Sequence, residues 1–297
     1  FDFILPGLLG SVHEFRGKFE QPNEDIEINK DSAKELSGRI RPFILRRLKC
    51  DLLEQLPPKQ EQILYCEFND EQKSIYSALA RDAGSLVDDN QLNKKRFAAL
   101  ALLMRLRQVC CHPVLVPGVK EERGEVNSAK FELLKELLYE ILDSSHRVLI
   151  FSQFTSMLKI IAGWLKDEGV IFEYLDGSTT NRQDKVDRFN EDETIKIFLL
   201  SLKAGGTGLN LTGADTVIHY DMWWNPQVED QATDRTHRIG QTKPVNVYKL
   251  VARDTIEDKV LKLQDKKREL FQNVMDGVPQ KLGDLNEEDL KYLLSGE

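Results

Sequence analysis

The second half of the chain alternates short apolar runs with amphipathic segments. The short runs are typical of buried strands, and the segments between them carry apolar residues at helical spacing. The predicted strands are residues 148–151, 172–175, 196–200, 216–220 and 245–251. Because strands that alternate with helices form parallel sheets covered on both faces, we predict an α/β fold here. Ligands of such sheets bind at the carboxyl ends of the strands.

The first half of the chain mixes helical stretches with proline and charged breaks. Residues 96–109 have apolar positions at helical spacing, and His112, followed by proline, ends this predicted helix. Residues 62–68 predict a strand, and the helix after it has Asn69 as N-cap with Gln72 at the capping-box position. We therefore expect a mainly helical segment ahead of the parallel sheet.

Charged residues 117–127, which include two glycines, predict a linker between the two halves. At the other end, a final helix is predicted from Asp254 as N-cap, with Glu257 at the capping-box position. An acidic tail follows, with a short helix at 287–294. The predicted segments are residues 1–60, 61–126, 127–253 and 254–297.

Composition narrows the class of protein. The net charge of −8 disfavours a simple basic nucleic-acid-binding domain. It does not exclude nucleic acid, because Arg39, Arg41, Arg46, Arg47 and Lys49 form a basic run without acidic residues. The chain lacks the roughly 18 consecutive apolar residues of a membrane span, so we expect no membrane partner. The start has no basic region before its apolar residues and predicts no secretion signal, as expected of a piece of a longer chain.

The four cysteines fit no zinc pattern. Cys110, Cys111 and His112 are consecutive, but a second ligand pair at useful spacing is missing. We therefore expect no metal site and reduced thiols. Reduced thiols indicate a cytoplasmic protein, or a nuclear one if the source is eukaryotic.

One segment after the fourth strand combines two arginines with a glutamine. Asn225, followed by proline, is a good helix start, and on a continuous helix Gln231, Arg235 and Arg238 stand at i, i+4 and i+7, on one face. Arginine suits phosphate oxygens because its planar fork stays charged and donates in two directions. The alternative is that neighbouring aspartates pair these arginines as ordinary surface salt bridges.

Residues 201–211 follow the third strand and are rich in glycine. Small residues let a backbone approach a ligand closely, and successive N–H groups can bind an anion. The spacing of a phosphate-binding loop is absent, and a tight strand-to-helix turn is the alternative.

Polar residues follow three other strands. Ser152 and Gln153 end the first, and Asp176, Gly177 and Ser178 end the second. Such groups can bond a phosphodiester backbone, although helix capping is the commoner role. Trp223 and Trp224, after the fourth strand, can stack on a ligand or pack in the core. The acidic pair that binds magnesium in motor ATPases has look-alikes at Asp70 with Glu71 and at Asp221. The sequence has no phosphate-binding loop for either of them to act with.

Taken in this order, these elements resemble the second lobe of superfamily-two helicase-like motors. More narrowly, they resemble the Swi/Snf-type DNA translocases and look closest to bacterial members. The run Arg238-Ile239-Gly240-Gln241 is close to a signature of that family. The other matching stretches are residues 41–47, 56–59, 148–154, 174–178, 201–211, 214–221, 223–226 and 230–241.

The resemblance implies a RecA-like fold and roles for particular residues. Arg235 and Arg238 are implied as arginine fingers, and Gln231, Gly206 and Gly208 as residues near ATP. The implied DNA contacts are Ser152, Gln153, Asp176, Gly177, Ser178, Lys203, Thr207, Trp223 and Asn225. The expected partners are double-stranded DNA, a first motor lobe in cis and a DNA-bound protein.

ATP with magnesium is expected to be held mainly by that first lobe, so the chain alone is predicted not to hydrolyse ATP. Two rival interpretations remain: a strand-separating DNA or RNA helicase on the same scaffold, and a non-catalytic scaffold. Retention of both arginines disfavours the second, and the Arg-Ile-Gly-Gln run disfavours the first.

Overall fold

The computed structural model describes residues 4–19, 35–36, 38–43, 57–88, 96–119, 126–205, 208–274 and 287–294. The chain divides into two compact units, Phe1–Leu53 with Asp265–Gly283 and Glu54–Gln264 with Asp284–Glu297. The first unit contains α1 (Val12–Phe19) and the 3-10 turn η1 (Arg41–Phe43). In it Glu35 pairs with Lys18 and Arg39 at 2.6 and 2.8 Å. Arg46, Arg47 and Lys49 of the predicted basic run lie outside the described residues.

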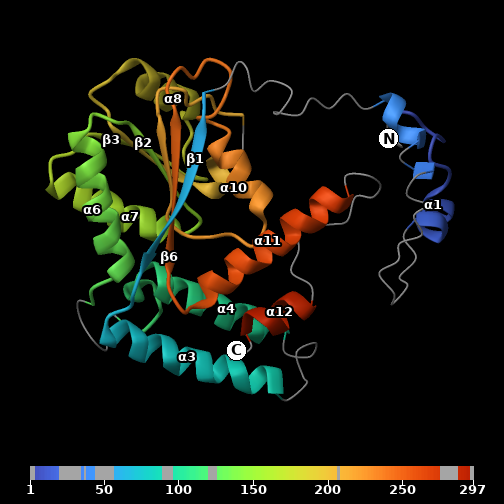
Figure 1. The fold of residues 1–297 in the computed structure, drawn as a ribbon, viewed down its shortest axis with the longest axis horizontal. Coiled ribbons are helices and arrows are strands. Elements are labelled where there is room, and N and C mark those ends of the chain that lie inside the picture. Colours follow the sequence, from blue (N-terminus) through green and yellow to red (C-terminus); the bar gives the residue numbers. More distant parts are fainter. Residues whose placement is uncertain are drawn as a thin grey trace. The chain divides into compact units, whose positions relative to one another are not determined.

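The second unit is built on a sheet of six strands, all parallel (Figure 1). Its strand order is β1-β6-β5-β2-β4-β3. The strands are β1 (Lys59–Cys66), β2 (Val148–Ser152), β3 (Phe172–Leu175), β4 (Ile197–Ser201), β5 (Thr216–His219) and β6 (Val245–Ala252). The α/β prediction and its five strands are confirmed. The earlier strand, β1, joins the same sheet, since Lys59 pairs with Val245 and Cys66 with Ala252.

Helices cover both faces of the sheet, as predicted. On one face α6 (Ala129–Asp143) and α7 (Thr155–Asp167) pack against the side that includes Val148 and Ile150 of β2. On the other, α8 (Arg182–Glu191) and α10 (Pro226–Thr233) pack against the side of Leu149 and Phe151. Burial on both faces explains why the strands read as continuous apolar runs.

A group of helices packs at the carboxyl end of β6 (Figure 1). It comprises α3 (Asp70–Asp88), α4 (Arg96–Cys111), α12 (Glu287–Leu294) and the start of α11 (Ile256–Val274). Two further short helices are η3 (Pro113–Leu115), which follows α4, and α9 (Leu202–Gly205), which follows β4. The group shares one core with Met222 and Val251, which lie at the ends of β5 and β6. None of these described helices is long and apolar enough to cross a bilayer.

At the start of α3 the predicted N-cap is present, but the second bond of the predicted capping box is not among the hydrogen bonds of the described residues. The backbone N–H of Gln72 donates to Asn69 Oδ1 at 2.8 Å, which confirms the N-cap. The Gln72 side chain does not bond back to Asn69 in the hydrogen bonds of the described residues. It is buried, donates to the Val109 carbonyl and accepts from Ala129 N at 2.8 Å. The Gln72 side chain therefore links α3 to α4 and α6 instead of completing a capping box.

The predicted start of α11 at Asp254 is wrong. Asp254 has a φ of 57°, outside helical geometry, and the helix begins at Ile256. The Thr255 hydroxyl accepts from Glu257 N at 3.2 Å and supplies the cap instead. Glu257 is buried and pairs with Lys130. Residues 120–125 of the predicted linker lie outside the described residues, and the four-segment division stays a prediction.

Candidate nucleotide and nucleic-acid interface

Because the six strands are parallel, their carboxyl ends meet at one edge of the sheet. The loops that leave β2, β3, β4 and β5 at this edge carry most of the predicted site residues. Three of these loops are described completely, and in the loop after β4 Gly206 and Thr207 lie outside the described residues.

The ends of β2 and β5 meet at the buried carboxylate of Asp221. Asp221 accepts from the hydroxyl of Ser152, from the backbone N–H of Gln153 at 3.2 Å and from Gln153 Nε2 at 2.6 Å. Ser152 is fully buried, so its hydroxyl faces Asp221 and not solvent. Burial raises the pKa of Asp221, and the positive charge of Arg107 opposes that shift.

Arg107 of α4 completes this cluster, and the sequence analysis missed it. Its Nη1 donates to Gln153 Oε1 at 2.8 Å, and its Nη2 donates to the carbonyl of Met222. Nη2 also lies 3.8 Å from Asp221 Oδ2. The available signal was its position four residues after buried Leu103, which puts a charge on the apolar face of the helix.

The loop after β3 is organised by Asp176. Its carboxylate accepts from Ser178 N at 2.9 Å, from the Ser178 hydroxyl at 2.6 Å and from the Tyr174 hydroxyl at 3.0 Å. The bond from the Ser178 hydroxyl is the main reason that the pKa of Asp176 is lowered. Gly177 and Ser178 are exposed at the tip of this loop. Asp176 therefore shapes the loop, while its two neighbours present backbone and hydroxyl groups to solvent.

The loop after β4 begins with the single turn of α9. Lys203 is exposed on it, and Ala204 N donates to Ser201 Oγ at 3.2 Å. Gly208 has a φ of +52°, a conformation that side chains disfavour, and a Cβ there would meet nothing within 4 Å. Glycine at this position is thus required by the backbone and not by crowding.

The two arginines do not lie on one helix face with Gln231, so that prediction is wrong. Asn225 caps α10 as predicted, with Gln227 N donating to its Oδ1 at 3.1 Å, but the helix ends at Thr233. The carbonyl of Arg235 accepts from Leu211 N at 3.0 Å. After Thr233 the backbone bonds are those of turns, with Thr236 N donating to the Thr233 carbonyl and Arg238 N to the Thr236 carbonyl, both at 3.0 Å. Arg235 and Arg238 therefore lie on the turns after α10.

Those turns, residues 234–241, are held from several sides. His237 Nε2 donates to the carbonyl of Pro57 at 2.8 Å. Gln241 Nε2 donates to the carbonyls of Thr212 and Ala214 at 3.2 and 2.6 Å. Arg238 is exposed, and Arg235 is half-buried. The Arg-Ile-Gly-Gln run thus pairs an exposed arginine with a buried glutamine that anchors the turn.

Comparison with known proteins identifies this arrangement. Residues 1–115 match the SNF2-related domain, and residues 129–240 match the helicase conserved C-terminal domain. The chain is 30% identical to the C-terminal part of the Fun30 ATPase domain, over 80% of this chain and 97% of that one, with a TM-score of 0.62. The chain belongs to the Swi/Snf-type (SNF2) family. It carries the RecA-like C-terminal lobe of that family.

Two further matches extend the comparison. The Sulfolobus solfataricus SWI2/SNF2 ATPase core in complex with dsDNA is 35% identical over 98% of this SNF2-type chain and 62% of that one, with a TM-score of 0.64. An uncharacterized ATP-dependent helicase of Mycoplasma pneumoniae is 38% identical over 93% of this chain, which supports a bacterial member. This chain spans 26% of that helicase, about a quarter of its length.

The tryptophan pair of this SNF2-type lobe packs on Arg107. The rings of Trp223 and Trp224 stack with centroids 3.7 Å apart, and the guanidinium carbon of Arg107 lies 5.1 Å from each centroid. Trp223 N donates to the buried carboxylate of Glu229 at 2.7 Å. Both tryptophans are half-buried, so the contacts within the lobe do not cover them completely.

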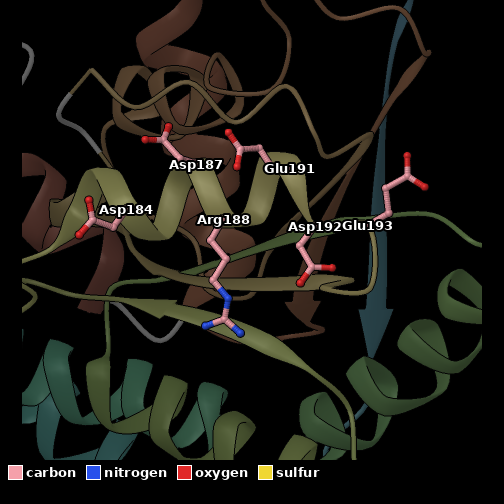
Figure 2. Close-up of a pocket in the computed structure, with 6 residues that line it drawn as sticks. All are labelled: Asp184, Asp187, Arg188, Glu191, Asp192 and Glu193. Carbon is pink, nitrogen blue, oxygen red and sulfur yellow. The ribbon is translucent and has the colours of Figure 1, made fainter.

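An acidic hollow lies along α8 (Figure 2). Figure 2 shows three acidic residues and Arg188 on the helix, with two further acidic residues directly after it: Asp184, Asp187, Arg188, Glu191, Asp192 and Glu193. Negative charge of this density repels a phosphodiester backbone. The hollow therefore lies on a part of the SNF2-type lobe that is unsuited to nucleotide phosphates.

Proposed function

We propose that this chain is the second-lobe portion of an ATP-dependent double-stranded DNA translocase. In this proposal Arg235 and Arg238 are arginine fingers that stabilise charge on ATP bound to a first lobe in cis. The supporting observation is the anchored turn, residues 234–241, which is bonded to Leu211, Pro57 and Ala214. Such anchoring pre-organises charged groups before a ligand arrives. In the same proposal Gln231, Gly206 and Gly208 act at the nucleotide.

In this proposal the chain supplies arginines to the nucleotide but neither a phosphate-binding loop nor a carboxylate for magnesium. No Gly-x4-Gly-Lys-[Ser/Thr] run occurs in the sequence. Asp221 is engaged by Ser152, Gln153 and Arg107, so its carboxylate is not available to magnesium. We infer that ATP with magnesium is held mainly by the first lobe and that the chain alone does not hydrolyse ATP.

The DNA-facing surface divides into contacting and supporting residues. Gly177, Ser178 and Lys203 are exposed at the carboxyl edge, and in our proposal they contact the DNA backbone together with Thr207. Ser152, Gln153, Asp176 and Asn225 shape the loops through the bonds described above. Trp223, which is half-buried, is a further candidate contact. Contacts of this kind go to the backbone, so the motor tracks DNA without reading bases.

Alanine substitution of the arginines tests the proposal in the full-length protein. Arg235→Ala or Arg238→Ala should lower DNA-stimulated ATP turnover by about 10³-fold, the scale of an arginine finger. DNA affinity should change by less than about threefold, because the arginines act on the nucleotide and the backbone contacts remain. Arg188→Ala is the matched control, since Arg188 is exposed on α8 beside the acidic hollow. Normal turnover in both finger variants would show that the assignment is wrong.

Translocation and strand separation are distinguished by substrate. A double-stranded DNA translocase displaces the third strand of a triplex but leaves a forked duplex paired. Unwinding of the fork by the full-length protein would favour the helicase interpretation.

We also propose a cytoplasmic or nuclear location, which agrees with the free thiols of Cys66, Cys110 and Cys111.

A further inference from the structure

The side chain of Arg107 links two parts of the chain that lie far apart in the sequence. Arg107 belongs to the segment that matches the SNF2-related domain, and its partners Gln153 and Asp221 belong to the helicase C-terminal segment. Only 1% of its surface is exposed. An unpaired arginine at this depth is strongly unfavourable, so its partners must satisfy both its charge and its donors.

The contacts of Arg107 need a guanidinium group. Two of its nitrogens donate in different directions, to Gln153 Oε1 and to the Met222 carbonyl. Its guanidinium carbon lies 5.1 Å from the ring centroids of Trp223 and Trp224 and 5.8 Å from that of Phe154. A lysine keeps the charge opposite Asp221, but it lacks the planar fork that donates to both Gln153 and Met222.

The bonds continue beyond Arg107. Gln153 accepts from Arg107 through Oε1, and it donates to Asp221 through Nε2 at 2.6 Å. Asp221 then accepts from Ser152. One arginine of α4 thereby fixes the orientation of the Gln153 amide and joins the loop after β2 to the loop after β5. These are loops that carry predicted DNA-facing residues.

We propose that Arg107 is a positioning residue that sets the loops after β2 and β5 for engagement of DNA. It acts through Gln153 and through the Trp223–Trp224 stack and touches neither DNA nor ATP. The inference rests on the proposed function for its biological meaning, since the loops it positions are the DNA-facing ones. It adds a residue from the helical group to the machinery of the C-terminal lobe.

The first test measures ATP turnover of the full-length protein as double-stranded DNA is titrated. Arg107→Lys should raise the half-saturating DNA concentration about tenfold, the factor that ~1.4 kcal/mol represents. The maximal rate should change less than about threefold, because the ATP-facing turn is untouched. Arg105→Lys is the matched control, since Arg105 is exposed two residues away on α4. An unchanged half-saturation in Arg107→Lys would overturn the proposal.

A second variant keeps the test decisive if Arg107→Lys folds poorly. Gln153→Ala removes the side chain through which Arg107 acts, and it should give the same rise. The double variant should be no worse than either single one, because coupled residues are not additive. Additive effects, or lowered melting temperature with unchanged half-saturation, would mean that Arg107 serves folding alone.

A spectroscopic signature separates this inference from the proposed function. The 297-residue chain has three tryptophans, and two of them form the stack on Arg107. The near-ultraviolet circular dichroism of that stack should change in Arg107→Lys and stay unchanged in Arg105→Lys. Wild-type protein without DNA-stimulated turnover refutes the proposed function. Normal wild-type turnover with an unchanged dichroism signal in Arg107→Lys refutes the positioning role alone.

Discussion

The ammonium group of Lys130 lies 2.5 Å from Oε1 of Glu257 and also contacts its second carboxylate oxygen. The two residues are 127 positions apart, both are buried, and they join α6 to the first turn of α11. Burial by itself lowers the pKa of Lys130, but the Glu257 carboxylate more than offsets this and raises it. Burial raises the pKa of Glu257, and the charge of Lys130 opposes that shift. The pair ties the first turn of α11 to α6.

Removing one member of this pair should be costly. Lys130→Met leaves the Glu257 carboxylate buried without its cation, so we expect the free energy of unfolding to fall by about 3–5 kcal/mol. Urea denaturation followed by circular dichroism measures the change. Lys135→Met is the matched control on the same helix, because the pair of Lys135 with Glu132 is on the surface and is worth under about 1 kcal/mol. Equal losses in the two variants would contradict a special role for the buried pair.

Stability should depend on the protonation of His219. Burial, and then the charge of Lys249, lowers the pKa of His219 from 6.5 to about 3. The folded state therefore favours neutral imidazole, and the unfolded state binds one more proton between these pH values. The contribution is complete above pH 6.5 and is lost as pH falls, at about 1.4 kcal/mol per pH unit.

Unfolding at a series of pH values between 5 and 6.5 measures this slope. His219→Gln should make the slope shallower by about that amount, while exposed His13→Gln should keep the wild-type slope. Parallel curves for wild type and His219→Gln would count against the effect. His112, whose pKa burial lowers to about 4, should supply part of the slope that remains.

Two glycines should respond oppositely to alanine. A Cβ on Gly213 would lie 2.9 Å from both Arg147 Nη1 and Asn190 Oδ1 and 3.2 Å from Asn190 Cα. Gly213→Ala should therefore destabilise the protein by about 1–3 kcal/mol. Gly163 is exposed within α7, where a Cβ meets nothing within 4 Å, so Gly163→Ala should stabilise by about 0.5–1 kcal/mol. Thermal melting reports both signs, and a stabilised Gly213→Ala would refute the crowding argument.

Glutamate in place of Gln241 should weaken the anchored turn. The Nε2 of Gln241 donates to two carbonyls, and Gln241→Glu replaces that donor with an oxygen that repels both. Leaving buried carbonyls without a donor costs about 1–3 kcal/mol, which denaturant unfolding detects. Gln60→Glu, on exposed β1, adds the same charge without this loss and should change stability by less than about 0.5 kcal/mol. A loss of similar size in both variants would indicate an effect of charge alone.

The strands were predictable because burial on both faces leaves a direct trace in the sequence. The run at 148–151 is apolar at every position, and all five residues of β2 are buried. The cap of α3 was equally local, since Asn69 bonds a residue three positions later. In each case the pattern and its physical cause lie within a few residues of each other.

The parts that failed depend on contacts between distant residues. The turn after α10 is joined to a distant loop by the bond from Leu211 N to the carbonyl of Arg235, which no pattern within the helix reveals. Arg107 looked like an ordinary charge on a helix because its partner Gln153 is 46 residues away. The sequence thus supplies candidate residues, and the fold determines which of them meet.

The pairing of β1 with β6 bears on how such lobes could be exchanged between relatives. A chain that began at Ala129, where the match to the helicase C-terminal domain starts, would leave one side of β6 without its eight paired residues. An open strand edge of that length invites association with other chains. The same cut would remove Arg107 and leave the buried Asp221 carboxylate without its positively charged partner. A transplanted lobe should therefore start ahead of Lys59, so that β6 keeps its partner strand.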